Sequence, residues 1–464
     1  MKIEYIYNKV KKGMRSQLCM MHYALCVAAA GTLQGCTFEQ EDFFDETAAL
    51  RVTHMNQKIK ERLVQQSAGG NHGWVIQYFV AGTDDYDFEG FNLFGDFEES
   101  GSVTLAGNHR FLRDGNANKY TEDTSTFKML AEEGPVLSFD TWNDILTVFE
   151  DPVDPSAAPG TLVNNGEGMN GDHNLVMSSF KDDEIVFLGE RHRAQIRFIP
   201  CDLPWEEYIQ TVTDMKNKIT NTTLTSYYVT NGTDTMYFSR LNRGYFNYVD
   251  RLVDPLKNKV LSCVFTPEGF RLHRVDSLSS NAFQEFTLAE DESCLMNEDG
   301  TVRVIACWDN YIVNHTAVWK FDPSTFTPEQ ASLYDQIAAE LLKYNKNYVL
   351  ESIGLGRSSG GNAVKGLVLT FYSNAAKTKT NTAGMSMSLS RLSYGNMELK
   401  YTSSDVGDAN MTAINKRATN LEQLTREFAA TLNGTYEVTP NDYFLPTGAE
   451  FKSTAGGHVY KLEQ

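Results

Sequence analysis

Short apolar stretches that end at Gly, Asn or Asp recur along most of this chain. They are rich in aromatic and β-branched residues, which suit a pleated and half-buried surface. This pattern predicts antiparallel β-strands joined by short loops. We expect strands at residues 73–79, 91–97, 102–105, 184–188, 194–199, 236–238, 261–265, 270–275, 302–308, 318–321, 367–372 and 385–392.

Four segments instead place apolar residues three or four positions apart, which predicts amphipathic helices. The third opens with Thr327-Pro328-Glu329-Gln330, in which Thr and Gln can form a capping box and Pro suits the first helical position. We interpret all four stripes as faces packed on a core, so the predicted fold class is α+β, predominantly antiparallel β with about four amphipathic helices. The helical segments are residues 47–66, 205–219, 327–342 and 421–432.

A weak internal similarity suggests two related halves. Asn71-His72-Gly73-Trp74-Val75 follows the first helix, and Asn345-Lys346-Asn347-Tyr348-Val349 follows the third. We expect an N-terminal β-rich domain at 48–322 and a C-terminal α+β domain at 323–464, with Asp322-Pro323-Ser324 as the linker.

The first residues carry the pattern of an export signal. Five basic residues and one acidic residue precede position 16, and a mostly apolar stretch, 18–33, ends at Leu33-Gln34-Gly35-Cys36. A basic region, a short apolar region and small residues before a cysteine predict a lipoprotein signal peptide at 1–35. The alternative is a cytosolic protein with a chance apolar start.

Cys36 is then expected to carry a diacylglycerol on its sulfur and an acyl chain such as palmitate on its freed amine. More than one chain makes membrane attachment stable. Residues 36–47 would form an acidic tether, which resembles the surface-export signal of Bacteroidota lipoproteins through Glu39, Glu41 and Asp42. A tether that is merely solvated is the alternative.

Composition limits the partners. Hydrophobic residues make up 41% of the chain and aromatic residues 12%, which is enough for folded cores. The formal net charge of −19 becomes −23 if residues 1–35, with five basic and one acidic side chain, are removed. Such an acidic protein lacks the basic surface that phosphates need, so nucleic acid is excluded as a partner.

Four cysteines follow the expected anchor: Cys201, Cys263, Cys294 and Cys307. An exported protein can form disulfides, and four cysteines allow three pairings. Cys294 and Cys307 flank Asp299-Gly300, a plausible hairpin turn, and are the best candidate pair.

The sequence assigns no catalytic residues, no metal ligands and no cofactor. Gly356-Arg357-Ser358-Ser359-Gly360 matches the nucleophile elbow of serine hydrolases, but a strand follows it instead of the helix that this mechanism needs. We interpret it as a hairpin loop. The acidic clusters 84–87, 182–184 and 290–292 are interpreted as solvated turns, with a calcium site in the first as the alternative.

Aromatic side chains are the better candidates for binding, because sugar rings and peptides stack on exposed Trp and Tyr. We expect most of them to lie in cores. Tyr245, Phe246 and Tyr248 form the candidate ligand-binding group.

Several short segments together carry a family resemblance. They are Cys36-Thr37-Phe38-Glu39, Asp42-Phe43-Phe44-Asp45, Arg51, Gly73-Trp74, residues 134–143, Gly171-Asp172 and residues 183–189. This set resembles the domain-of-unknown-function 4302 family of Bacteroidota lipoproteins. The resemblance implies an outer-surface lipoprotein without assigned catalytic residues. It also implies a gene placed beside a TonB-dependent transporter, the transporter's lipoprotein lid and sometimes a zinc-dependent peptidase.

We therefore expect a non-catalytic accessory that binds a glycan or a peptide for a TonB-dependent nutrient uptake system. It would be lipid-anchored in the outer membrane and face the cell exterior. The alternatives are a structural subunit of a surface assembly and a hydrolase with an unrecognised site.

Overall fold

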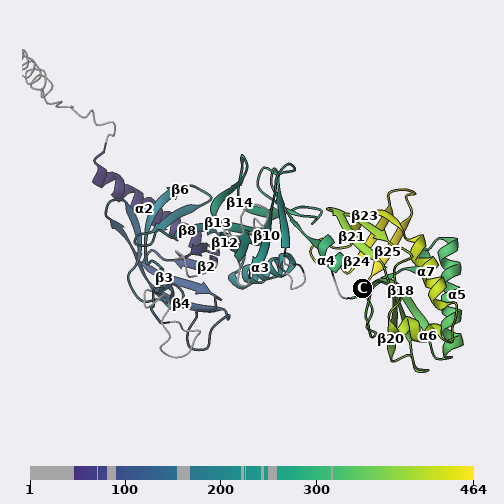
Figure 1. The fold of residues 1–464 in the computed structure, drawn as a ribbon. Helices are drawn as coiled ribbons and strands as arrows, with labels where there is room; N and C mark the ends of the chain where they lie inside the picture. Colours follow the sequence, from purple (N-terminus) through teal and green to yellow (C-terminus); the bar gives the residue numbers. More distant parts are fainter. Residues whose placement is uncertain are drawn as a thin grey trace, which may run out of the picture. The chain divides into compact units, whose positions relative to one another are not determined.

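Figure 1 shows the computed structural model, which describes residues 46–70, 72–80, 90–153, 168–220, 224, 226–241, 245–248, 259–314 and 317–464. Helix α2 (Ala48–Ser67) begins in a first compact unit that ends at Met55 and continues into a second, Asn56–Gln464, which contains all the sheets. Within the described ranges, no helix is long and apolar enough to cross a membrane.

Eight consecutive strands form a closed antiparallel barrel, the first barrel. Each strand pairs with the next, and β1 also pairs with β8, with Trp74 opposite Pro200 and Tyr78 opposite Ile196. Closure leaves no edge strand with unpaired backbone groups. The strands are β1 (Trp74–Phe79), β2 (Gly90–Phe97), β3 (Ser102–Gly107), β4 (Thr121–Ala131), β5 (Pro135–Phe139), β6 (Asn174–Phe180), β7 (Ile185–Gly189) and β8 (Gln195–Pro200).

Aromatic side chains fill the interior of the first barrel. The Phe198 ring lies 6.2 Å from that of Trp74, 6.1 Å from that of Phe97 and 5.0 Å from that of Phe187. A 3-10 turn, η1 (Thr147–Phe149), inserts a further buried ring. An eight-stranded barrel has an interior just wide enough for side chains, so this one is a packed core.

A second barrel repeats the same order of helix and strands. Its first strand pairs with its last, with Tyr227 opposite Ala306. The preceding helix is α3 (Trp205–Ile219), and the strands are β9 (Ser226–Thr230), β10 (Thr235–Leu241), β11 (Tyr245–Tyr248), β12 (Lys259–Phe265), β13 (Gly269–Leu278), β14 (Asn281–Leu288), β15 (Leu295–Met296) and β16 (Arg303–Ala306).

The preceding helix is tied to its barrel in the same way in both cases. The Trp74 indole N–H donates to the Leu63 carbonyl in the last turns of α2, at 3.0 Å. The Tyr227 hydroxyl donates to the Ile219 carbonyl at the end of α3. Ile219 is the last residue of α3, where carbonyls lack helical partners, whereas the Leu63 carbonyl also accepts from the Ser67 hydroxyl of α2 at 3.1 Å.

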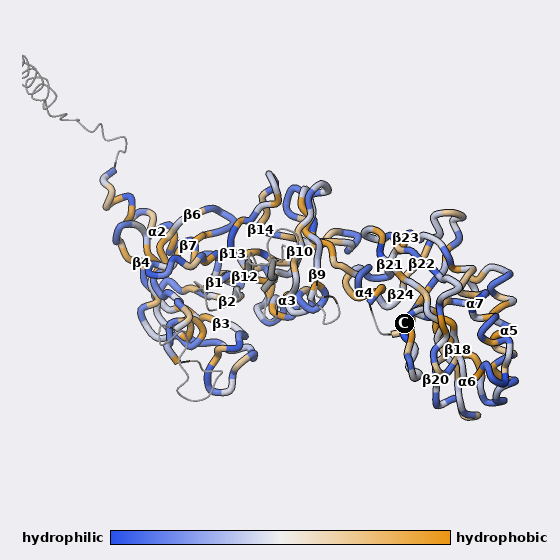
Figure 2. The backbone as a smooth tube through the Cα atoms, viewed as in Figure 1, coloured by the Kyte–Doolittle hydropathy of each residue, from blue (hydrophilic) through white to orange (hydrophobic). Residues whose placement is uncertain are grey.

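The rest of the described chain forms a nine-stranded antiparallel sheet with helices. The buried Gln330 amide donates to Thr431 and to the Tyr460 hydroxyl, at 3.0 and 2.8 Å, and so joins two helices to the sheet. Hydrophobic and hydrophilic residues are interspersed along the strands (Figure 2). The elements are α4 (Trp308–Asn314), β17 (Trp319–Phe321), η3 (Pro323–Thr325), α5 (Pro328–Tyr344), β18 (Val349–Arg357), β19 (Lys365–Tyr372), β20 (Thr380–Ser386), β21 (Ser388–Ser393), β22 (Asn396–Lys400), α6 (Ala409–Asn415), α7 (Leu421–Thr431), β23 (Gly434–Pro440), β24 (Gly448–Ser453) and β25 (Val459–Glu463).

The expected class, α+β with a predominance of antiparallel strands, is confirmed. The expected helical segments correspond to α2, α3, α5 and α7, and the capping box of Thr327 and Gln330 is present. The described residues add the short helices α4 and α6. The relation between two halves stays a prediction, as does the domain boundary; the expected linker lies in and just before η3.

Two expectations about local structure are corrected. The strand expected at 302–308 ends at Ala306, and Trp308 begins α4. The strand expected at 385–392 is divided between β20 and β21.

The candidate disulfide between Cys294 and Cys307 is not formed, because both are free, buried thiols. The hairpin between them is present, with β15 paired to β16. Burial raises the pKa of the Cys307 thiol to about 12, and its sulfur contacts Tyr228 instead of Cys294. Turn geometry brought the two strands together but did not direct the two sulfurs toward each other.

Candidate ligand-binding groove

Several residues singled out in the sequence lie outside the described residues. These are Cys36, Glu39, Glu41 and Asp42 of the expected anchor and tether, and the acidic cluster 84–87. The candidate ligand-binding residues Tyr245, Phe246 and Tyr248 lie on strand β11, which pairs with β10 and β12.

Ser358 lies in a hairpin loop, as expected. It follows the last residue of β18, and Arg357 pairs with Lys365 of β19. Its hydroxyl is buried and accepts a hydrogen bond from the Val364 backbone N–H at 3.1 Å. The side chain therefore holds the loop closed.

The two described acidic clusters lie in turns. Glu184 forms ion pairs with Lys181 and Arg197, and the Asp291 carboxylate accepts from Ser293. Among the described residues, no group of three or more His, Cys, Asp or Glu side chains could hold a metal ion.

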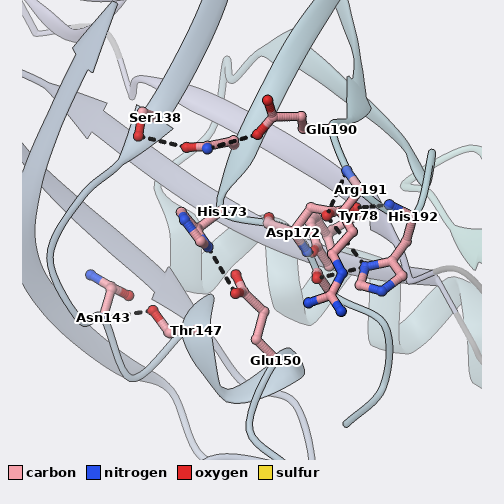
Figure 3. Close-up of polar contacts among 12 residues, drawn as sticks. Tyr78, Ser138, Asn143, Thr147, Glu150, Asp172, His173, Glu190, Arg191 and His192 are labelled. Atoms are coloured by element: carbon pink, nitrogen blue, oxygen red, sulfur yellow. Dashed lines mark hydrogen bonds and ion pairs between the residues drawn. The ribbon is translucent and has the colours of Figure 1, made fainter. Parts of the chain in front are cut away.

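A buried polar network surrounds Asp172 (Figure 3). Its carboxylate accepts from the backbone N–H groups of Arg191 and His192, at 3.1 and 3.0 Å. The Tyr78 hydroxyl accepts from the Asp172 N–H at 2.8 Å and donates to the Asp172 carbonyl at 3.3 Å. We call these four residues the Asp172 clasp. It ties the chain before β6 to the turn between β7 and β8.

A second set of contacts lies beside the clasp (Figure 3). His173 pairs with Glu150 at 2.8 Å. Burial raises the pKa of the Glu150 carboxyl, and the His173 contact opposes this effect. Asn174 accepts from Ser138 and donates to Glu190, at 2.7 and 2.8 Å. These side chains bind one another and the backbone, so we interpret the network as structural.

The clasp and the adjacent Phe149 explain two glycines of the segments that carry the family resemblance. A Cβ atom on Gly189 would lie 2.0 Å from the Asp172 carboxylate, and one on Gly171 would lie 2.7 Å from the Phe149 side chain. Both positions need a residue without a side chain because another group already fills that space.

A groove of about 320 Å³ lies between elements of both barrels. One wall is α3, which contributes Tyr208 and Lys216. The opposite wall is formed by β2, through Phe91 and Asn92, and by the segment after β3, residues 108–110. The end of β12 contributes Phe265. A site of this size, formed by rigid elements, is at the small end of ligand pockets.

Packing between the two barrels fixes the groove's walls. The Asn92 side-chain amide of β2 donates to the Phe265 carbonyl of β12 at 2.8 Å. Arg197 of β8 forms an ion pair with Glu285 of β14, and the buried Arg271 shares this carboxylate at 3.1 Å. On the first barrel, the Phe94 ring stacks with Trp205 of α3 at 5.7 Å.

Burial shifts the pKa of two groove side chains, His109 and Tyr208. Burial lowers the pKa of His109 to about 4, so its ring is neutral at pH 7. Its Nε2 lies 3.0 Å from the Ile145 carbonyl, which can only accept, so Nε2 carries the proton. Burial raises the pKa of Tyr208, and the Glu268 carboxylate adds to this, so the phenol stays protonated.

Two acceptors at the groove lack partners among the described residues. The ring Nδ1 of His109 and the side-chain oxygen of Asn92 are both buried without a hydrogen bond. A buried polar atom without a partner costs about 1–3 kcal/mol.

Sequence analysis did not find the groove residues. One signal was available, since Lys216 falls eight positions after Tyr208 and four after Val212, on the apolar stripe of α3. A cation on an otherwise apolar face is a candidate for contact with a ligand. The remaining residues come from separate strands, and no local pattern connects Phe91, His109 and Phe265.

Replacing Gly189 with Ala tests the clasp. The new Cβ would overlap the Asp172 carboxylate, so we expect the free energy of unfolding to fall by about 2–4 kcal/mol. Gly134→Ala is the matched control, because a Cβ there meets nothing within 4 Å. Thermal and urea unfolding followed by circular dichroism measure both. Equal stability of the two variants would contradict the clasp.

The state of His109 predicts a dependence of stability on pH. Its folded pKa, about 4, lies below the ordinary value of 6.5, so only the unfolded chain binds a proton between these values. Stability is therefore complete above pH 6.5 and is lost as the pH falls toward 4. At about 1.4 kcal/mol per pKa unit, the loss from this residue between pH 7 and 5 is about 2 kcal/mol. In urea titrations, His109→Gln should lose less stability than wild type over this range by that amount, and an equal loss would show that His109 is not the group responsible.

Comparison with known proteins connects the chain to a family. No curated protein matches it. Among solved structures, a putative DNA polymerase III beta subunit from Eubacterium rectale aligns over 88% of this chain and 96% of its own, at 9% identity and a TM-score of 0.12, which supports no argument on fold or function. The family model described as "Domain of unknown function (DUF4302)" matches residues 40–290, a span that includes every groove residue named above. The match covers more than half of the chain, and the chain belongs to this family.

Proposed function

We propose that this protein is a lipid-anchored outer-membrane lipoprotein, facing the cell exterior, that binds a ligand in the α3 groove as an accessory of TonB-dependent nutrient uptake. The observation that carries the binding role is the groove, with its combination of aromatic rings, side-chain amides and cations. Few polar groups placed among aromatic walls are typical of sites that hold and orient a ligand.

The anchoring part of the proposal rests on the sequence. Cys36 follows small residues and an apolar stretch, and Glu39, Glu41 and Asp42 follow it. The transporter partner rests on the family resemblance. Ser358 offers no support for a hydrolase, because its hydroxyl is buried and bonded within its own loop.

Filling the groove should weaken binding. Thr213 is exposed and lines the groove, so Thr213→Trp should weaken binding at least tenfold by occupying the ligand's space. Asp214→Trp is the matched control, since it places the same residue at an exposed position of α3 that does not line the groove. Isothermal titration calorimetry of the full chain in detergent micelles, against a panel of neutral disaccharides, acidic disaccharides and tripeptides, measures the effect.

Two results would count against the binding role. In the first, wild type binds no member of the panel; in the second, Thr213→Trp binds as tightly as Asp214→Trp. Co-purification of one stoichiometric protein partner without any ligand would point instead to a structural subunit of a surface assembly.

Replacing Cys36 with Ala tests the anchor. The thiolate is the nucleophile for diacylglyceryl transfer, and the signal peptidase cuts only after this step, so the variant should stay uncut or become soluble in the periplasm. Membrane fractionation and labelled palmitate provide the measurement. Incorporation of palmitate by Cys36→Ala would overturn the assignment.

A second variant separates anchoring from export to the surface. Replacement of Glu39, Glu41 and Asp42 by Ala should leave lipidation unchanged but keep the protein facing the periplasm. Protease treatment of intact cells distinguishes the two orientations. If the triple variant is cleaved like wild type, the acidic run serves only as a tether.

A further inference from the structure

The surface where the two barrels meet, here called the barrel contact, is rich in polar groups. On the outer face of the first barrel, Gln77 lies in register between Asn92 of β2 and Arg197 of β8. Asn92 donates to the Phe265 carbonyl and Arg197 pairs with Glu285, so this row faces the second barrel. Gln77 is 1% exposed, yet its side-chain oxygen has no hydrogen-bond partner among the described residues. Such an atom weakens the contact, because water would bind it if the barrels parted.

His273 of β13 is the titratable ring in the barrel contact. It stacks on Phe79 of β1, with the ring centres 4.7 Å apart and an angle of 11° between the ring planes. Burial, and after it the charges of Arg274 and Arg271 on the same strand, lower the pKa of His273 to about 4. The ring is therefore neutral at pH 7, and a proton on it would be both poorly solvated and repelled.

The other elements around His273 do not offer a free carboxylate. Strand β14 contributes Glu285, which is already bound by Arg271 and by Arg197 of β8. Helix α3 packs on β13 as well, and its Lys216 lies with the ammonium 5.5 Å from the centre of the Phe265 ring. Strand β1 presents the uncharged Phe79. Within the described part of the chain, no carboxylate contributes to the pKa of His273, so nothing there would stabilise its protonated form.

The stack of Phe79 on His273 also supports the α3 groove. A Cβ atom on Gly90 would lie 2.6 Å from the Phe79 ring and 2.8 Å from the Cβ of Val264, so Gly90 is packed tightly between these two residues. Gly90 of the first barrel and Val264 of the second both line the groove. Displacement of Phe79 would therefore change how the groove's two sides meet.

From this geometry we infer that the barrel contact is a switch that opens in acid. As the pH falls, His273 takes up a proton and leaves the Phe79 ring, and the two barrels part along the groove. The groove then releases its ligand. This last step rests on the proposed function, whereas the opening itself does not.

The direction of the effect follows from proton binding. In the closed contact the pKa of His273 is about 4, and a solvated ring has the ordinary value of 6.5. Between these values only the open form binds the proton, so the closed form is fully favoured above pH 6.5 and is disfavoured progressively as the pH falls toward 4. This linkage shifts the equilibrium toward the open form by about twentyfold between pH 7 and pH 5.

Energy transfer between dyes on the two barrels tests the switch in the full chain in detergent micelles, without any ligand. Azide-bearing residues at Glu133 and Glu298, exposed loop positions of the first and second barrels, carry pH-insensitive dyes. Transfer should fall between pH 7 and pH 5. His273→Gln cannot take up the proton and should remove this change. His109→Gln, the same substitution at another buried histidine whose pKa is lowered to about 4, should keep it.

A second variant leaves the histidine in place. Arg274→Gln removes one of the two cations that act on His273, so the change in transfer should be smaller than in wild type. Constant transfer in wild type, or an equal fall in His273→Gln, would overturn the switch. A fall that is accompanied by loss of the far-ultraviolet circular dichroism signal would also overturn it, because the barrels would then be unfolding instead of parting.

Binding measurements separate the switch from the proposed function. Because transfer is measured without ligand, a wild type that binds nothing at pH 7 contradicts the proposed function and leaves the transfer result to decide on the opening. A neutral disaccharide that binds at pH 7 should bind more weakly to wild type at pH 5, and equally at both pH values to His273→Gln. Equal binding to wild type at both values, with a fall in transfer, would show that opening does not release the ligand.

Discussion

The pairing of β1 with β8 is the contact on which the arrangement of this protein depends. It closes the first barrel, and it leaves the chain at Pro200, opposite Trp74. Helix α3 therefore begins beside the barrel and stacks Trp205 on the outward-facing Phe94. The end of the same helix meets Tyr227 of the second barrel. One helix thus contacts both barrels, and the groove is the space that remains along it.

Helix ends are satisfied in a recurring way in the three sheets. Trp74 bonds the Leu63 carbonyl, Tyr227 bonds that of Ile219, and Tyr436 bonds that of Leu432 at 2.7 Å. In each case an aromatic residue near the start of a strand reaches back to the end of the preceding helix. Each contact joins a carbonyl near the end of a helix to the strand that follows, and so fixes how the helix leads into its sheet.

Local patterns in the sequence were sufficient for the helices, since the stripe of α5 and its cap at Thr327 involve residues a few positions apart. Closure of the barrels could not be predicted in this way. It pairs Tyr78 with Ile196 and Tyr227 with Ala306, and no spacing rule relates strands so distant in sequence. The groove depends on the same long-range pairings. The candidate pairing of Cys294 with Cys307 failed for a related reason, because a correctly predicted turn does not determine where two side chains point.

The polar groups that are poorly satisfied include residues where the two barrels meet. Arg271 is 4% exposed, and burial lowers its pKa to about 10, which still leaves it charged at pH 7. It shares Glu285 with Arg197, so one exposed carboxylate serves two guanidinium groups. The Asn92 side-chain amide donates to the Phe265 carbonyl, while its side-chain oxygen has no hydrogen-bond partner among the described residues. Folding alone would favour apolar residues at such positions, because replacing a buried charge by a well-packed apolar side chain is often stabilising. Of these polar residues, Asn92 lines the groove, whereas Arg271 and its partners lie elsewhere between the two barrels.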